Sequence, residues 1–310
     1  MNLMFQTVLA TLLEVIVPLS VPVAAGALLK RFTKMDTKPF TTFFLYFLTP
    51  ALILDTLTNA DISYGDVVTT AAFSLLNLAL LWGIALAFGK LLKLPAPEQA
   101  GVTLAATLTN SVNYGLPLVL LALGKLGLDK ASVYVILQMI LVNTIGVYMA
   151  ARSQFSIKNA VKSVFSLPAI YAAMLAVGLQ AFDLNLPSGV QTGVAMVAGA
   201  YAPVVLAILG AQMVGVNNAG ADRNVRAGVW AGIAIRLLLS PFVAWLCLYL
   251  LKVEGVLYAV LFILSCMPVA VNAVVLSERF NASPKLVSKC ILWTTLASFL
   301  VLPVIIVYVK

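Results

Sequence analysis

The chain has 310 residues, of which 62% are hydrophobic and 10% are charged, and its mean hydropathy is +1.06. This composition excludes an ordinary soluble domain and predicts an integral membrane protein whose main partner is the lipid bilayer. The net charge of +8 does not indicate nucleic-acid binding, because the basic residues are spread over short segments instead of gathering on one face.

Apolar blocks long enough to cross a bilayer follow one another along almost the whole chain. The first block is too long for the core of a signal peptide, and no basic residue precedes it, so we interpret it as a spanning helix. The sequence therefore predicts an all-α membrane protein with ten transmembrane helices, at residues 4–28, 40–58, 66–89, 99–123, 131–151, 163–182, 192–216, 227–251, 255–277 and 287–309.

The basic residues fall mainly in alternate loops. One side of the membrane would hold fourteen of them: Lys30, Arg31, Lys34, Lys38, Lys90, Lys93, Arg152, Lys158, Lys162, Arg223, Arg226, Arg279, Lys285 and Lys289. The other side would hold four: Lys125, Lys130, Lys252 and Lys310. The positive-inside rule places the richer side in the cytoplasm of a cell (inner) membrane and both termini outside.

Five helices in each half would make the second half enter the membrane from the opposite side, as in an inverted repeat. Pro50 and Pro203 are 153 residues apart, and Pro117 and Pro268 are 151 apart. We expect a first five-helix repeat at 1–152, a short basic linker at 153–164 and a second, inverted repeat at 165–310.

The fourth and ninth blocks are each interrupted near the middle. The fourth contains Asn110-Ser111-Val112-Asn113-Tyr114-Gly115-Leu116-Pro117, and the ninth contains Pro268-Val269-Ala270-Val271-Asn272. A helix in hydrocarbon can be broken only where protein or a watered cavity shelters the freed backbone groups. Matched breaks in two halves indicate the substrate site of a secondary transporter.

The residues at these breaks suit an anion. The half-helices that start there would direct N–H groups and a partial positive charge into the cavity. The amides of Asn110, Asn113 and Asn272 can donate to a carboxylate. Gly115 would allow a bend, and Pro117 suits the first turn of the next half-helix. Tyr114 and Pro268, at the same breaks, are further candidates for the substrate site. The alternative is that the three Asn residues only cap broken helix ends.

Few other polar side chains lie inside the apolar blocks. Glu14 and Arg236 could pair, or Arg236 could anchor an anion and Glu14 carry a proton; Arg236 could also snorkel, and Glu14 could make only a structural hydrogen bond. Asp55 is a further candidate for ion coupling, or is simply solvated. Gln138, Asn143 and Gln212 are secondary candidates for substrate binding, although hydrogen bonding between helices is their default role.

At these motifs the chain resembles prokaryotic members of the auxin efflux carrier family, whose fold is related to that of the bile acid–sodium symporters. The matching residues include Asn110, Gly115 and Pro117 in the fourth block, and Pro268, Ala270 and Asn272 in the ninth. The resemblance implies ten helices with crossing broken helices, alternating access and often a homodimer. It also implies organic anions as substrates, such as auxin-like aromatic acids or malate- and malonate-type dicarboxylates. Val112 and Asn113 depart from the family pattern.

Other functions remain as alternatives. A sodium-coupled symporter of the bile acid type could draw oxygen ligands from Glu14, Gln138 and Asn143, and proton coupling is also open. A membrane sensor with a transporter-like fold would normally need an output domain. An enzyme is not expected, since the chain has no His, no Walker loop and no paired intramembrane Asp residues. We expect no cofactor and no bound metal.

Overall fold

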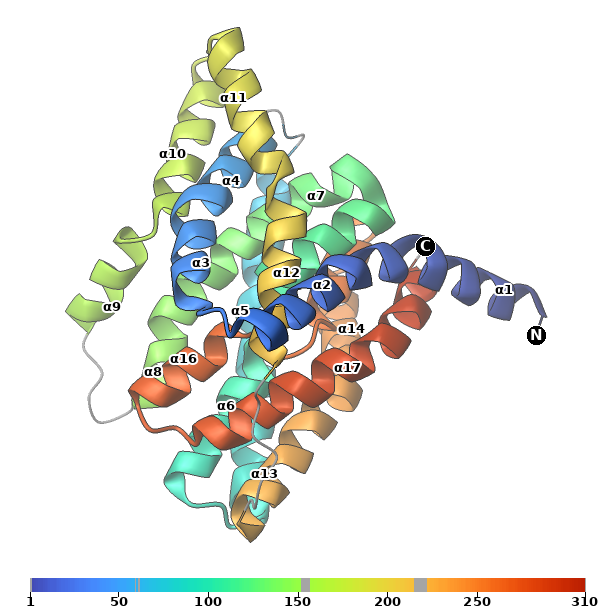
Figure 1. Ribbon diagram of the computed structural model, residues 1–310, viewed down its shortest axis with the longest axis vertical. Coiled ribbons are helices and arrows are strands. Elements are labelled where there is room, and N and C mark those ends of the chain that lie inside the picture. The colour runs from blue at the N-terminus through green and yellow to red at the C-terminus, as the bar shows by residue number, and fades with distance from the viewer. Residues whose placement is uncertain (1, 59, 61, 152–156, 215–221, 310) are drawn as a thin grey trace.

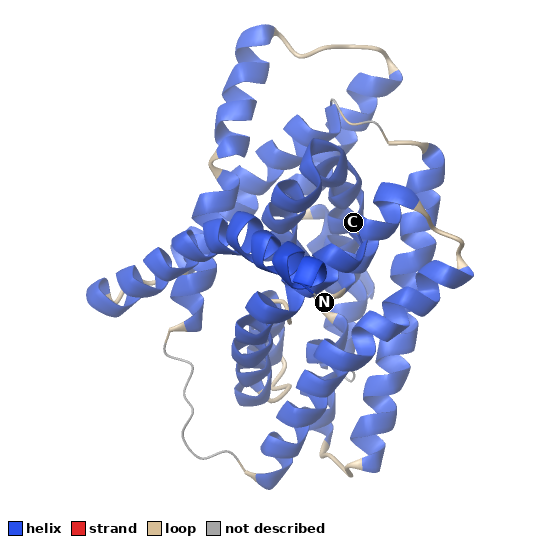
Figure 2. Cartoon of the chain, turned by 90° about the vertical axis from the view of Figure 1, so that its right-hand side faces the viewer, coloured by secondary structure: helices blue, strands red, loops and turns tan. Residues whose placement is uncertain are grey.

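The computed structural model describes residues 2–58, 60, 62–151, 157–214 and 222–309. Within these ranges every regular element is a helix, and the one β-type contact is an isolated antiparallel bridge between Thr109 and Val269. The helices pack side by side and cross at varied angles, as Figures 1 and 2 show. The described chain is thus all-helical.

The first 151 residues form three long helical runs and one interrupted run. In chain order the elements are α1 (Asn2–Thr11), η1 (Leu12–Ile16), α2 (Val17–Thr33), α3 (Lys38–Phe43), η2 (Phe44–Leu48), α4 (Thr49–Thr58), α5 (Tyr64–Leu91), α6 (Ala96–Thr107), η3 (Ser111–Gly115), α7 (Leu116–Leu141), η4 (Val142–Gly146) and α8 (Val147–Ala151). The η elements are single π-helical turns.

The described residues after 156 also form α-helices, with one π-helical turn among them. The elements are α9 (Ile157–Phe165), α10 (Pro168–Ala181), α11 (Ser188–Gly199), α12 (Tyr201–Met213), α13 (Arg223–Ala234), η6 (Ile235–Leu239), α14 (Ser240–Leu250), α15 (Gly255–Ser265), α16 (Asn272–Arg279) and α17 (Pro284–Val309). Residues 153–156 of the expected linker lie outside the described residues, and the rest of it forms most of α9.

Seven helical runs of the described chain are long and apolar enough to cross a bilayer: Gln6–Thr33, Lys38–Thr58, Tyr64–Leu91, Ser111–Ala150, Ser188–Met213, Arg223–Leu250 and Pro284–Val309. The run Ser111–Ala150 has 40 residues, about twice what one crossing needs. Gly124 divides it, because its backbone (φ 69°, ψ −161°) is not helical. Two apolar helices, α10 and α15, are shorter. These spans make the chain a multi-pass membrane protein.

Four of the π-helical turns precede a proline. The N–H groups of Val17, Thr49, Leu116 and Ser240 each donate to the carbonyl five residues earlier, and a proline follows each of them in the sequence. Proline lacks the N–H that would continue the helix ladder, and a wide turn pairs the neighbouring groups instead. Each of these four prolines is therefore accommodated by a local widening of its helix.

The tightest helix contact joins α2 to α12. A Cβ atom placed on Gly26 would lie 1.8 Å from the carbonyl oxygen of Ala207, and one on Gly210 would lie 1.8 Å from that of Val23. Only glycine permits this approach of two backbones. Close packing of small residues is typical of helices in a membrane, where the hydrophobic effect does not drive their association. This contact fixes α12 against the first helix beside the site described next.

Candidate functional site

The first interruption separates α6 from η3. The helix α6 ends at Thr107, and Leu108 is extended (φ −95°, ψ 113°). Asn110 is also non-helical (φ −79°, ψ 48°) before the chain resumes a helical course at Ser111. Pro117 lies in the first turn of α7, directly after η3, and the wide turn of η3 accommodates its missing N–H.

The second interruption separates α15 from α16. The helix α15 ends at Ser265, and α16 begins at Asn272. The residues between them, 266–271, are buried and include Pro268. Each break therefore brings together the carboxyl end of one helix and the amino end of the next.

The two breaks lie against each other and satisfy one another's backbone. Asn110 N–H donates to the carbonyl of Pro268 (2.8 Å), and Ala270 N–H donates to the carbonyl of Leu108 (2.9 Å). The hydroxyl of Thr294 accepts from the N–H of Val269 at 3.1 Å. Freed backbone groups at membrane depth need such partners, and here each break supplies them to the other.

Arg236 joins the carboxyl ends of the two half-helices that enter the breaks. Its guanidinium donates to the carbonyl of Ala106 at 2.9 Å and to the carbonyl of Ser265 and the hydroxyl of Ser240. These carbonyls belong to the last turns of α6 and α15, where the helix dipole places negative partial charge. Arg236 is fully buried. This burial means that Arg236 does not snorkel to the surface, so that hypothesis is wrong. Glu14 is exposed and does not pair with the buried guanidinium, so the hypothesis of an Arg236–Glu14 pair is wrong as well.

Asn110 and Asn113 are buried at the first break, each at 3% exposure. The amide nitrogen of Asn110 and the amide oxygen of Asn113 have no hydrogen-bond partner in the described structure. Because a buried amide without a partner costs free energy, these atoms are available to a ligand or an ordered water.

Gly115 serves packing and not bending. Its backbone is helical (φ −66°, ψ −46°), so the expected bend at this residue is wrong; the chain departs from the helix at 108–110 instead. A Cβ atom on Gly115 would lie 2.6 Å from Cδ2 of Leu264 in α15. The absent side chain lets the two interrupted segments approach.

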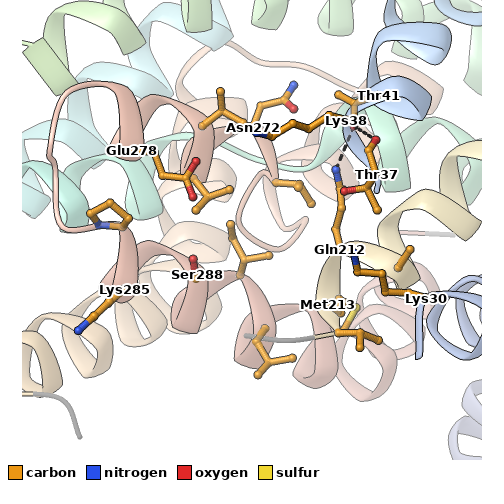
Figure 3. A pocket seen from close by; sticks show the side chains of 18 of the residues that line it. Lys30, Thr37, Lys38, Thr41, Gln212, Met213, Asn272, Glu278, Lys285 and Ser288 are labelled. Carbon is orange, nitrogen blue, oxygen red and sulfur yellow. Dashed lines mark hydrogen bonds between the residues drawn. The ribbon is translucent and has the colours of Figure 1, made fainter. Parts of the chain in front are cut away.

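A cavity of about 970 Å³ opens beside the second break (Figure 3). It lies between α12, α16, α17 and the segment from the end of α2 through α3, and Asn272 lines it. Gln212 of α12 also lines it, and its amide donates to the hydroxyl of Thr41 at 3.3 Å. The cavity therefore reaches the amino end of α16.

The charges that line this cavity are mostly positive. The basic residues are Lys30, Lys38, Arg279 and Lys285, and the single acidic one is Glu278. The Lys30 ammonium donates to the carbonyl of Met35, whereas Lys38 and Lys285 are exposed. Such a lining attracts anions and raises their local concentration.

The other predicted site residues are divided between this region and elsewhere. Tyr114 and Pro268 are buried at the breaks. Gln138 is buried and donates to the hydroxyl of Tyr134 at 2.8 Å, and Asn143 donates to the carbonyl of Met139 one turn earlier. Asp55 is half-buried in α4. Of the predicted site residues, Gln212 and Asn272 line the cavity, and none of the others, including Asn110 and Asn113, does so.

Several residues of the site were not predicted from the sequence. Tyr201 of α12 donates to the carbonyl of Val112 in η3 at 3.0 Å, and Thr294 and Ser240 hold the breaks as described above. The cavity lysines were interpreted only as signs of orientation. Thr37 and Thr41 are four residues apart and so lie on one helical face. This spacing could have predicted a polar side of the cavity.

The chain is similar to known membrane transport proteins. A family model described as "Membrane transport protein" matches residues 7–306. An uncharacterized transporter of Methanothermobacter thermautotrophicus is 28% identical over 257 residues, which cover 82% of this chain and 83% of the relative. An uncharacterized transporter of Methanocaldococcus jannaschii is 25% identical over 217 residues, covering 68% of each chain. The protein is a transporter of the cell membrane and not an enzyme, and the chain belongs to the membrane transport protein family, that of the auxin efflux carriers.

Proposed function

We propose that the protein is a secondary transporter of small organic anions that holds the substrate carboxylate where its two interrupted helices cross. The observation that carries this proposal is the pair of breaks bonded to each other beside a cavity with a basic lining. Half-helix amino ends and neutral amides can bind a carboxylate without a fixed buried charge, so the substrate can also leave.

The proposed architecture has ten transmembrane segments in two inverted groups of five, with both termini outside. The division of the run Ser111–Ala150 at Gly124 and the short apolar helices α10 and α15 support this count. The packing of α1 against α17 supports placing the two ends of the chain on one side. The cavity would then open to the cytoplasm, and alternating access would close it and expose the breaks to the outside.

We further propose that no sodium ion is needed at the carboxyl ends of α6 and α15. Such helix ends coordinate Na⁺ in other transporters, but the guanidinium of Arg236 already donates to the carbonyls there. Glu14, Gln138 and Asn143, the oxygen donors considered for a sodium site, are not gathered at one place: Glu14 is exposed, and the two amides bond within their own helical segment.

A flux assay in reconstituted vesicles tests the proposed transport. Counterflow of a labelled carboxylic acid, chosen from a panel of aromatic acids and dicarboxylates, should be saturable and should be lost in Asn272→Ala. The matched control is Asn224→Ala, at an exposed position of α13 outside the cavity. Binding of an acid without any flux would instead indicate a sensor, and no dependence on Asn272 would refute the proposed site.

A further inference from the structure

A second hollow lies between α13 and α17, apart from the cavity at the breaks. It has a volume of about 520 Å³, and its lining shares no residue with the first cavity. The lining residues are Arg226, Val229, Trp230, Ile233, Leu237, Lys289, Trp293 and Ala297. It contains two cations and no acidic side chain.

The two helices present the same pattern to this groove. In α13 a basic residue, Arg226, is followed four residues later by Trp230. In α17 Lys289 is followed four residues later by Trp293. Residues four apart lie on one face of a helix. Apart from Val229, the aliphatic lining comes further along both helices, so the groove is basic at one end, aromatic next and apolar beyond.

Close packing on the inner side shapes the groove. A Cβ atom on Gly228 would lie 2.4 Å from Cδ1 of Leu286, and one on Gly232 would lie 2.8 Å from Sγ of Cys290. The two helices therefore touch along their small residues. Trp230 and Trp293 remain 72% and 50% exposed, so the hollow opens outward, away from the helix bundle.

We propose that this groove binds one phospholipid with an anionic headgroup. The phosphate would lie between the guanidinium of Arg226 and the ammonium of Lys289, and an acyl chain would lie along the apolar residues. Basic pockets between helices on the cytoplasmic side suit anionic lipid headgroups, and Trp favours the level of the membrane interface. This site is independent of the transported substrate.

Charge complementarity selects a lipid over other occupants. A second copy of the chain that met this face symmetrically would bring two further cations against the first two. A free phosphate would leave the apolar part of the groove unused. An anionic phospholipid satisfies both ends at once.

Native mass spectrometry of the delipidated protein tests the proposal. Phosphatidylglycerol and phosphatidylcholine of identical acyl chains are added separately, with glycerol phosphate as the free-headgroup arm. The wild type should retain phosphatidylglycerol preferentially and ignore glycerol phosphate. The double variant Arg226→Gln/Lys289→Gln should lose about 30-fold in affinity for phosphatidylglycerol, since each basic residue near a membrane surface contributes about fivefold.

The matched control is Lys90→Gln/Lys93→Gln, which removes two exposed charges elsewhere in the basic loops and should keep the lipid. The single variants Arg226→Gln and Lys289→Gln are measured too, so a folding defect in the double variant would not end the test. Equal retention of the two lipids by the wild type, or unchanged retention in the variants, would overturn the proposal. So would a lipid-independent change of oligomeric state in the variants by light scattering, which would assign the groove to a second copy.

Discussion

Arg236 donates a hydrogen bond of 2.9 Å to the carbonyl oxygen of Ala106, one residue before the end of α6. The same guanidinium reaches the carbonyl of Ser265 at the end of α15. One buried cation thus connects the two interrupted segments at the ends where the helix dipoles are negative. Its planar fork of donors can serve both acceptors at once.

Arg236→Ala should destabilise the protein by about 1–3 kcal/mol for each carbonyl left without a donor. Arg236→Lys should recover only part of this, because an ammonium cannot reproduce the fork. Thermal unfolding in detergent measures both. Arg31→Ala, at an exposed position of α2, should stay within about 0.5 kcal/mol of the wild type. Equal stability of Arg236→Ala and Arg31→Ala would contradict the structural role of the guanidinium.

Transport should not depend on sodium. Because Arg236 already supplies a positive charge at the carboxyl ends of α6 and α15, a coupling cation placed there would be repelled by the guanidinium. The initial rate of uptake into vesicles is measured with Na⁺ and with choline at equal ionic strength. The two rates should agree, and a strict requirement for Na⁺ would favour the sodium-symporter alternative.

Gly115→Ala should reduce stability by about 1–3 kcal/mol through overpacking, since its Cβ would meet Leu264 at 2.6 Å. Combining it with Leu264→Ala should cost less than the sum of the two single changes, because the second change removes the clash. A double-mutant cycle by thermal unfolding gives the coupling. Gly83→Ala is the control, because nothing lies within 4 Å of its added Cβ. Strict additivity would argue against the close contact.

Removing two charges from the cavity should weaken substrate capture. Lys38→Gln/Lys285→Gln should raise KM for an anionic substrate by about threefold to tenfold, with the maximal rate little changed. The effect should shrink as salt is added, because exposed charges are screened. Lys125→Gln/Lys252→Gln, at exposed positions outside the cavity lining, should leave KM unchanged. A KM that rises equally in both double variants would indicate a general charge effect.

The interrupted helices were accessible from sequence because proline, glycine and asparagine have strong local preferences. The exact position of the first break was not accessible from the sequence: it lies at 108–110, at the amino end of the Asn110–Pro117 motif, where the hydrogen bonds to Pro268 and from Ala270 hold it. The prolines show the same limit: the sequence gives the positions of Pro18 and Pro241, but only the structure shows the wide helical turns before them.

Composition and the length of the apolar blocks by themselves determined that this is an all-helical membrane protein, because spanning a bilayer requires about 20 apolar residues whatever their neighbours are. The Asn, Gly and Pro residues inside two of these blocks located the motifs around which the site forms. Only the tertiary structure decided what Arg236 does and which lysines line the cavity. Those facts depend on groups far apart in the chain, such as Arg236 and the carbonyl of Ala106, which are 130 positions apart, and no local preference of a residue encodes such a meeting.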